Sequence, residues 1–254
     1  MNTFKEKLVS IKEVWFDEEP EQLSDIDIVH YYQRTNRIEY IEFDEFHTRL
    51  VDLNEDENVL WEKLGKNNRY KIKRASEKDH VTYQYWDAQS IEFDTLDKFL
   101  DFHDQFSLSQ GLKKINIHRI KSYLDAGIFD LSLVKSQDGI PLTWHGHCCV
   151  RNRACFLYSA SIRDSKDTSY QSLVGRTNRY HHWQDMLRFK KSGISVYDFG
   201  GWYAGDIDKK LLNINKFKEE FGGEVVQNFK ALHGVTLKGK LFVFLYKLRA
   251  KMIG

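Results

Sequence analysis

The sequence predicts an α/β fold in which a mixed, mostly antiparallel sheet is flanked by helices. Residues 129–135, 140–150 and 154–162 are rich in β-branched and aromatic residues and are separated by short turn sequences, which is typical of three antiparallel strands. Residues 169–191 follow with apolar side chains at helical spacing. A short apolar run, a glycine turn and another helical segment then complete an alternation of strands and helices.

The composition describes a well-ordered chain with ample material for a core. Its 254 residues can form one large domain or two small ones, and 14% of them are aromatic. A formal net charge of +1 gives no general attraction to nucleic acid, so any basic surface must be local. The first twenty residues are charged and lack the apolar stretch of a signal peptide, and no run is long enough to span a bilayer.

The cysteine pattern indicates a reducing compartment. Cys148, Cys149 and Cys155 are the cysteines of the chain, an odd number without a C-x-x-C pair. We therefore expect a cytoplasmic protein.

The N-terminal part is expected to combine strands with a basic helix. Residues 3–14 are predicted as a helix, and residues 26–32 and 37–53 as strands. Asn54 can cap a following helix, which becomes basic after Gly65. Two interpretations of the basic stretch remain open: a solvated helix face, or a site for phosphate or pyrophosphate.

The central part supplies the remaining elements. Residues 81–86 are predicted as a strand, and residues 94–110 and 116–125 as helices. After the three strands and the long helix, residues 194–199 form a strand that ends in Gly200 and Gly201. The next helix carries Lys218 and ends at Gly222 and Gly223, since glycine tolerates a positive φ there.

The last two elements are a strand at residues 224–232 and a basic, apolar helix at residues 237–253. This helix can either dock on the core or lie in the interface of a membrane, so peripheral membrane contact at the inner face is an expectation.

Three segments in order resemble the Fem-type aminoacyltransferases of the GNAT superfamily. They are Asn68-Arg69-Tyr70-Lys71-Ile72-Lys73-Arg74-Ala75, then Leu157-Tyr158-Ser159-Ala160-Ser161, then Tyr197-Asp198-Phe199-Gly200-Gly201 with Phe217-Lys218 and Phe221-Gly222-Gly223. The resemblance implies a GNAT-like fold built from a partial N-terminal unit at 1–92 and a complete unit at 93–236, followed by the helix at 237–254. In many GNAT enzymes a glycine-rich loop opens the long helix and binds coenzyme A. The second glycine of that loop is missing around Gly175, which favours aminoacyl-tRNA as the donor.

The resemblance also implies a set of site residues. Lys218 is expected to stabilise the oxyanion, Asp198 to orient or deprotonate the attacking amine, and Tyr158 to belong to the catalytic pocket. The expected binding residues, some for phosphate and some for the rest of the substrate, are Arg176, Lys71, Lys73, Arg74, Trp144, His145, Tyr180 and Trp202.

Histidines gather on one predicted strand, and metal binding is the alternative to weigh there. His145, His147 and Cys149 share a face by period-two alternation, with His181 and His182 elsewhere. No pair has the spacing of a dedicated zinc motif, so we expect no metal.

The sequence therefore predicts an N-acyltransferase or aminoacyltransferase. It would move a group from acyl-CoA, acyl carrier protein or aminoacyl-tRNA to an amine of a cell-envelope glycan or peptidoglycan precursor. The alternative is a non-catalytic module of the same fold that binds tRNA or a lipid-linked glycan.

Overall fold

The computed structural model describes residues 1–161 and 167–253 and divides into two compact units. The first unit comprises Met1–Thr48, Asn116–Ala126 and Val226–Gly254, and the second comprises Arg49–Ile115 and Gly127–Val225. Each unit is thus assembled from segments that are far apart in the sequence. This division differs from the predicted boundary near residue 92, which falls inside the second unit, and it includes the C-terminal helix in the first.

The first unit holds the beginning of β4 (Asp44–Asp52) and four further strands. These four are β1 (Asn2–Glu6), β2 (Val9–Trp15), β3 (Ile28–Arg34) and β10 (Glu224–Gly234), whose first two residues belong to the second unit. β1 pairs antiparallel with β2, β2 parallel with β3, and β3 antiparallel with β10. Helix α4 (Ile117–Asp125) packs against β1, and α7 (Leu237–Ile253) packs against β2 and β3.

The helix predicted at residues 3–14 is wrong, because this segment forms β1, a turn and β2. Phe4, Leu8 and Ile11 fit a helical stripe, yet Leu8 lies in the turn and is 86% exposed. Phe4 and Ile11 are buried instead, in a cluster with Ile28. A short apolar pattern is ambiguous between the two periods, and pairing with the distant β3 decided in favour of strand.

The second unit holds the longer series of strands and helices. Its strands are the end of β4 (Asp44–Asp52), β5 (Thr82–Trp86), β6 (Phe129–Lys135), β7 (Pro141–Val150), β8 (Arg153–Ser161) and β9 (Val196–Trp202). Strands β5 to β8 pair antiparallel in sequence order, and β8 pairs parallel with β9. The predicted α/β fold with a mostly antiparallel sheet is therefore confirmed.

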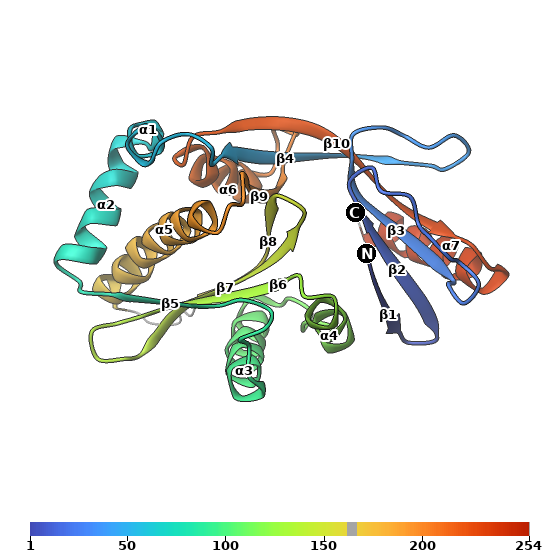
Figure 1. The fold of residues 1–254 in the computed structure, drawn as a ribbon, viewed down its shortest axis with the longest axis horizontal. Coiled ribbons are helices and arrows are strands. Elements are labelled where there is room, and N and C mark those ends of the chain that lie inside the picture. Colours follow the sequence, from blue (N-terminus) through green and yellow to red (C-terminus); the bar gives the residue numbers. More distant parts are fainter. Residues whose placement is uncertain (162–166, 254) are drawn as a thin grey trace. The chain divides into compact units, whose positions relative to one another are not determined.

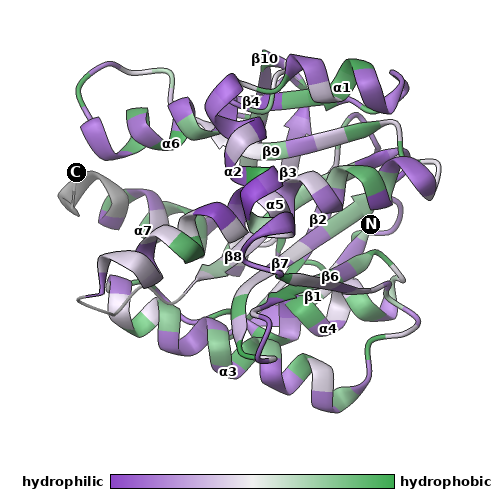
Figure 2. Cartoon of the chain, turned by 90° about the vertical axis from the view of Figure 1, so that its left-hand side faces the viewer, coloured by the Kyte–Doolittle hydropathy of each residue, from purple (hydrophilic) through white to green (hydrophobic). Residues whose placement is uncertain are grey.

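Helices cover both faces of these strands. α5 (Thr168–Lys191) lies on one face and α3 (Phe93–Gln110) on the other, as Figure 1 shows. α3 is amphipathic, and green apolar residues alternate with purple polar residues along its ribbon in Figure 2. α2 (Lys66–Glu77) packs against α5, and α6 (Lys209–Glu219) follows β9.

The helix predicted after Asn54 is two helices, α1 (Glu57–Lys63) and α2. The chain is extended at Leu64 and Gly65, and Gly65 occupies the N-cap of α2. The N-cap of α1 is Asp56 rather than Asn54. Within the described residues, no helix combines the length and the apolar character needed to cross a membrane.

Candidate functional site

The parallel strands β8 and β9 separate after a short stretch of pairing. Their paired residues are Arg153 with Val196, Ala154 with Tyr197 and Cys155 with Asp198. β8 then continues to Ser161 and β9 to Trp202, with no further pairing between them in the part of the chain that the structure describes. Functional residues often lie where neighbouring strands separate, because the side chains at their ends can then face a substrate.

Gly200 and Asp198 shape the point where β9 leaves β8. Gly200 has a φ of +69°, and a Cβ there would lie 3.0 Å from the carbonyl oxygen of Phe156 on β8. Asp198 is fully buried, and its Oδ1 accepts a hydrogen bond of 2.8 Å from the Gly200 N–H. Its Oδ2 lies 3.6 Å from Nε of Arg153. The Asp198 carboxylate therefore fixes this turn. The Fem-type resemblance implied a different role for Asp198, which was to orient or deprotonate the attacking amine.

Lys218 reaches the same turn from α6. Its Nζ donates hydrogen bonds to the carbonyl oxygens of Gly200, at 3.2 Å, and of Gly201, at 2.5 Å. The side chain is buried, with 8% of the residue exposed. Burial lowers the pKa of Lys218 to about 8, although the nearby charge of Asp198 acts in the opposite direction. A lysine with this pKa is mostly protonated at neutral pH and loses its charge as the pH rises through about 8.

Tyr158 lies on β8 beyond the last pair with β9, on the side covered by α3. Its ring makes edge contacts with Phe99, His103 and Phe129, at centroid distances of 6.4, 5.8 and 6.2 Å. Gly146 is opposite, where a Cβ would lie 3.1 Å from the Phe129 ring and 3.3 Å from the Cβ of Tyr158, so this glycine makes room for the Phe129 ring that packs against Tyr158. Tyr158 is thus half-buried within an aromatic cluster.

Trp202 ends β9 and is half-buried. The guanidinium of Arg49 lies 5.3 Å from the centre of its ring and donates hydrogen bonds to the carbonyls of Gly222 and Gly223. A cation held by two backbone carbonyls is well placed for a cation–π contact, so Arg49 links the end of β9 to the glycine turn after α6.

The cations expected to bind phosphate lie on α2 and α5 and differ in their surroundings. Arg176 already makes a two-pronged ion pair with Asp79, at 2.6 and 2.9 Å. Arg74 is exposed and donates to the Tyr70 hydroxyl at 3.2 Å. Lys73 lies 5.7 Å from the ring centre of Trp61. Arg176 therefore has less capacity for a substrate phosphate than the sequence suggested.

Lys71 on α2 is influenced by the positive charges of two arginines on α5. Its pKa is lowered first by burial and then by the charges of Arg179 and Arg176, while Glu220 acts in the opposite direction. Arg179 pairs with Glu220 at 2.9 Å. No pattern in the sequence indicates that Arg179 on α5 influences Lys71 on α2, because the two helices meet only through tertiary packing.

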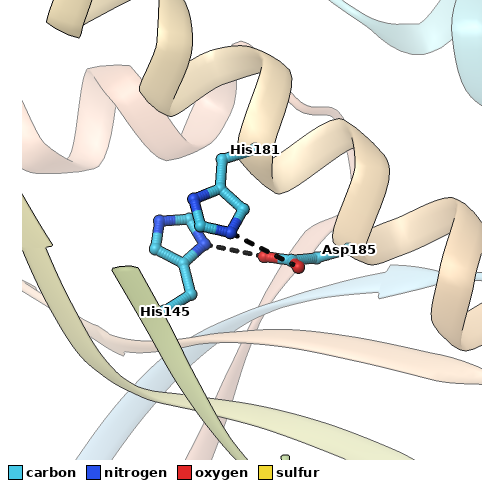
Figure 3. A group of neighbouring side chains, drawn as sticks. All are labelled: His145, His181 and Asp185. Carbon is cyan, nitrogen blue, oxygen red and sulfur yellow. Dashed lines mark hydrogen bonds and ion pairs between the residues drawn. The ribbon is translucent and has the colours of Figure 1, made fainter. Parts of the chain in front are cut away.

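His145, His181 and Asp185 form a fully buried group between β7 and α5 (Figure 3). Nδ1 of His145 lies 2.7 Å from Oδ2 of Asp185, and Nε2 of His181 lies 3.9 Å from Oδ1. Ser132 and Tyr83 donate to Oδ1 at 2.7 and 2.9 Å. The sequence shows that Asp185 lies one helical turn after His181 on α5. It does not show the other partners of Asp185, because they lie on strands far away in the sequence.

The group has the residue types of a metal centre and the geometry of a hydrogen-bond network. Its ligand atoms all lie within 4.8 Å of one another. The rings of His145 and His181 are stacked, however, with 3.6 Å between centroids and 5° between planes. Imidazole lone pairs lie in the ring plane, so parallel rings cannot direct them at one ion. His145 is therefore held in the core, and the structure gives it no contact with solvent.

The charge state of this network follows from burial. Burial lowers the pKa of His181, His182 and His147, so these imidazoles are neutral at pH 7. Burial raises the pKa of Asp185, but the neighbouring imidazoles and the hydrogen bond from His145 outweigh it and hold that pKa below its usual range. Asp185 is an ionised carboxylate surrounded by donors.

Trp144 and Tyr180 lie on opposite faces of the sheet. Trp144 is 2% exposed and stacks on Trp86 at 5.6 Å, beside a cavity of about 430 Å³ that is also lined by residues of α3. Tyr180 on α5 is half-buried among the apolar side chains that join α2 and α5 to the sheet, and burial raises its pKa.

No protein-family model matches the sequence, and no curated protein matches it. Solved structures do share the fold. FemX aligns with a TM-score of 0.58 at 16% identity, and the match covers 72% of this chain and 61% of FemX. This chain therefore spans less than two thirds of that protein.

Two further solved structures also match, the L-PGS of Bacillus licheniformis and a domain of a putative lysylphosphatidylglycerol synthetase. The protein from Bacillus licheniformis has a TM-score of 0.58 at 11% identity, over 97% of this chain and 84% of that one. The C-terminal domain of a putative synthetase from Agrobacterium fabrum has a TM-score of 0.56 at 13% identity, over 85% and 71%. At these identities the likeness concerns the fold, and it confirms the fold that the Fem-type resemblance implied: the chain has the fold of FemX and of these two proteins.

Proposed function

We propose that this protein is an acyltransferase that moves an acyl or aminoacyl group to an amine of a cell-envelope glycan or peptidoglycan precursor. The observation that carries the proposal is Lys218, a buried ammonium held at the point where β8 and β9 separate. The fold shared with FemX, with L-PGS and with a putative lysylphosphatidylglycerol synthetase supports it, since the last is named for a product that carries an aminoacyl group.

The reaction needs no covalent enzyme intermediate. A neutral amine attacks the carbonyl carbon of an ester or thioester, a C–N bond forms, and negative charge develops on the carbonyl oxygen. The C–O or C–S bond then breaks, and the proton lost by the amine goes to the leaving group. The enzyme must stabilise the oxyanion and hold both reactants in position.

Lys218 is suited to meet that negative charge. An ammonium has three N–H donors, and Gly200 and Gly201 accept two of them in the described residues. The third donor is the one that we assign to the oxyanion. Asp198 acts through the backbone by fixing the Gly200 turn, so it is a positioning residue in this proposal.

The donor is an acyl-CoA, an acyl carrier protein thioester or an aminoacyl-tRNA, each of which carries phosphate. We assign its phosphate contacts to Lys71, Lys73 and Arg74 on α2, with Arg176 contributing only if its pair with Asp79 opens. We also propose peripheral contact with the inner face of the cytoplasmic membrane, which the basic helix α7 with its exposed apolar residues supports.

The test is a transfer assay with radiolabelled aminoacyl-tRNA and acyl-CoA against amine acceptors, namely amino-sugar nucleotides, stem peptides and lipid-linked sugars. Lys218→Met keeps the length of the side chain and should lower turnover roughly a hundredfold to a thousandfold, equivalent to about 3–4 kcal/mol. Lys216→Met is the matched control, because Lys216 is exposed on the same helix.

The two variants separate the proposal from its alternative. If folded Lys218→Met and Lys216→Met turn over equally, the assignment of Lys218 is wrong. Specific binding of tRNA or a lipid-linked glycan, with no turnover for any donor and acceptor pair, would identify a non-catalytic binding module instead.

A further inference from the structure

A cavity of about 630 Å³ lies wholly within the first unit. Residues of β3, β10, α7 and the segment that begins β4 line it. Cavities of this size commonly hold small molecules, and such sites are mostly apolar with a few placed polar groups. The cavity belongs to a different unit from Lys218 and has no part in the proposed transfer.

The lining is largely apolar, and its two lysines, Lys230 and Lys247, are both half-buried. Phe46, Leu232 and Phe244 contribute apolar surface, and the Nζ of Lys230 lies 5.4 Å from the ring centre of Phe46. Burial lowers the pKa of His30 to about 3, with the charges of Arg119 and Lys230 adding to the effect, so this imidazole is neutral. An apolar cavity with a cation in its wall suits the tail and the anionic head of an amphiphile.

The acidic residues of the lining do not cancel this preference. Glu42 and Asp44 are both exposed. Glu42 pairs with the half-buried Lys247 at 2.6 Å, and the Glu42 side chain is 80% exposed, so solvent screens this pair and it contributes little. Lys247 is engaged by Glu42, whereas Lys230 makes no ion pair within the described residues, so Lys230 is the lining cation available to an anion.

Helix α7 forms one wall of the cavity and also an exposed apolar surface. The large apolar residues of α7 that are at least 45% exposed are Leu237, Leu241, Phe244, Leu245, Tyr246 and Leu248. Phe244, Tyr246 and Leu248 also line the cavity, so the cavity borders this surface. Contiguous apolar surface of this kind marks an interaction site.

The charge of α7 indicates what covers that surface. Between Leu237 and Arg249 the helix has four basic residues and no acidic one. Lys238 already pairs with Asp27, at 2.7 Å. Basic helices with exposed apolar residues bind anionic bilayers by burying the apolar side and attracting the lipid head groups.

We propose that α7 docks on an anionic bilayer and that the cavity beside it takes one acyl chain of an anionic phospholipid, with the phosphate on Lys230. The bilayer supplies the ligand at the surface where the cavity lies. The lipid site therefore also provides a physical reason for membrane association that is independent of any substrate of the transfer reaction.

The lipid site is tested by calorimetric titration with monomeric lysophosphatidylglycerol and, separately, lysophosphatidylcholine. Saturable binding of one lysophosphatidylglycerol per chain is expected. Lys230→Glu should weaken this binding by about tenfold or more and leave lysophosphatidylcholine nearly unchanged, because only the former head group is a net anion. Lys113→Glu is the control, since Lys113 is exposed in the second unit. Absence of saturable binding, or equal affinities for the two charge-reversal variants, overturns the lipid site.

The apolar part is tested by Leu232→Trp, which fills the cavity and should block both lysolipids. The melting temperature of Leu232→Trp is measured alongside. If Leu232→Trp fails to fold, Lys230→Glu still tests the lipid site, because the Glu substitution leaves the cavity open. Leu232→Trp that folds and binds like the parent overturns the assignment of the cavity.

The docking step is tested by co-sedimentation with vesicles of phosphatidylglycerol and phosphatidylcholine. Leu245→Asp should lose most vesicle binding and keep lysolipid binding, because Leu245 is 53% exposed and does not line the cavity. Leu108→Asp is the matched control on α3, where Leu108 is 85% exposed. Equal sedimentation of both variants overturns docking through α7. None of these assays depends on turnover, so their failure would leave the transfer proposal intact.

Discussion

Lys218 keeps its positive charge where burial disfavours it. Its folded pKa of about 8 lies below the ordinary lysine value of 10.5, so raising the pH through 8 removes the proton in the folded protein. The oxyanion role needs the protonated form. Activity should therefore fall as pH rises above about 8.

This alkaline loss can be assigned by substitution. Lys218→Arg should retain some activity without the loss near pH 8, because a guanidinium stays charged throughout the accessible range. The measurement is turnover from pH 6 to pH 10 with a saturating acceptor. An unchanged alkaline limb in Lys218→Arg would mean that another group titrates.

Asp185 holds several buried donors at once. His145, Ser132 and Tyr83 all converge on its carboxylate in the core. Asp185→Ala leaves these donors unpaired, and the free energy of unfolding should fall by about 3–5 kcal/mol.

Urea unfolding measures the effect, with Asp104→Ala as the control. Asp104 pairs with Lys114 at the surface, and such a pair is worth about 1 kcal/mol or less. Similar losses for the two variants would show that the buried network contributes no more than a surface ion pair.

At the scale of elements, two glycines with different surroundings should respond in opposite directions to alanine. Gly223 has a φ of +75°, and a Cβ there would lie 2.1 Å from the carbonyl oxygen of Leu50. Gly175 lies within α5, and a Cβ there meets nothing within 4 Å.

Gly223→Ala should therefore destabilise the protein severely, whereas Gly175→Ala should stabilise it by about 0.5–1 kcal/mol because alanine loses less entropy in a helix. Melting temperatures of the two variants check this. A stable Gly223→Ala protein would show that the turn between α6 and β10 can adopt another conformation.

The basic helix α2 offers a comparison between two of its cations. Lys71 is half-buried beside Arg179 and Arg176, whereas Arg74 is fully exposed. If α2 binds the phosphates of a substrate, Lys71→Ala should raise KM for it more than Arg74→Ala does, with little change in kcat. Steady-state kinetics at two salt concentrations measures this. Unchanged KM for every phosphate-bearing substrate would leave α2 as a solvated face.

For the whole molecule, the buried histidines predict loss of stability in acid. The pKa values of His147 and His30 are lowered to about 3, and those of His181 and His182 lie well below 6.5. Between pH 6.5 and 3 the unfolded chain binds protons that the folded chain does not. Stability is therefore complete above pH 6.5 and falls below it, by up to about 1.4 kcal/mol per pH unit for each histidine.

Urea unfolding at several pH values between 7 and 4 tests this, with His147→Phe and His118→Phe as a pair. His147 is buried, its Nδ1 has no partner among the described residues, and its Nε2 contacts the Tyr197 hydroxyl at 3.1 Å, so Phe at this position removes one titrating ring and should make the pH dependence shallower. His118 is exposed, and its replacement should leave the dependence unchanged. A parent protein equally stable at pH 7 and pH 4 would contradict the burial of these rings.

Much of the local structure could be predicted from the sequence. The three central strands, α5 and α7 appear within one or two residues of their expected bounds. Residues 3–14 could not be placed, because a short apolar run fits both periods until a distant strand pairs with it. The sequence placed Asp198 before the turn at Gly200 and Gly201, and Lys218 before a different turn at Gly222 and Gly223. It did not indicate that both side chains would bond to the first turn.

The sequence by itself determined the order and type of most elements, because side-chain period and turn residues act over a few neighbouring positions. Only the tertiary structure decided the electrostatics. Arg176 meets Asp79, 97 residues away in the sequence, and His145 meets Asp185, 40 residues away. Pairings of this kind, and the burial that shifts the pKa of Lys218, arise from the packing of strands and helices that no local pattern encodes.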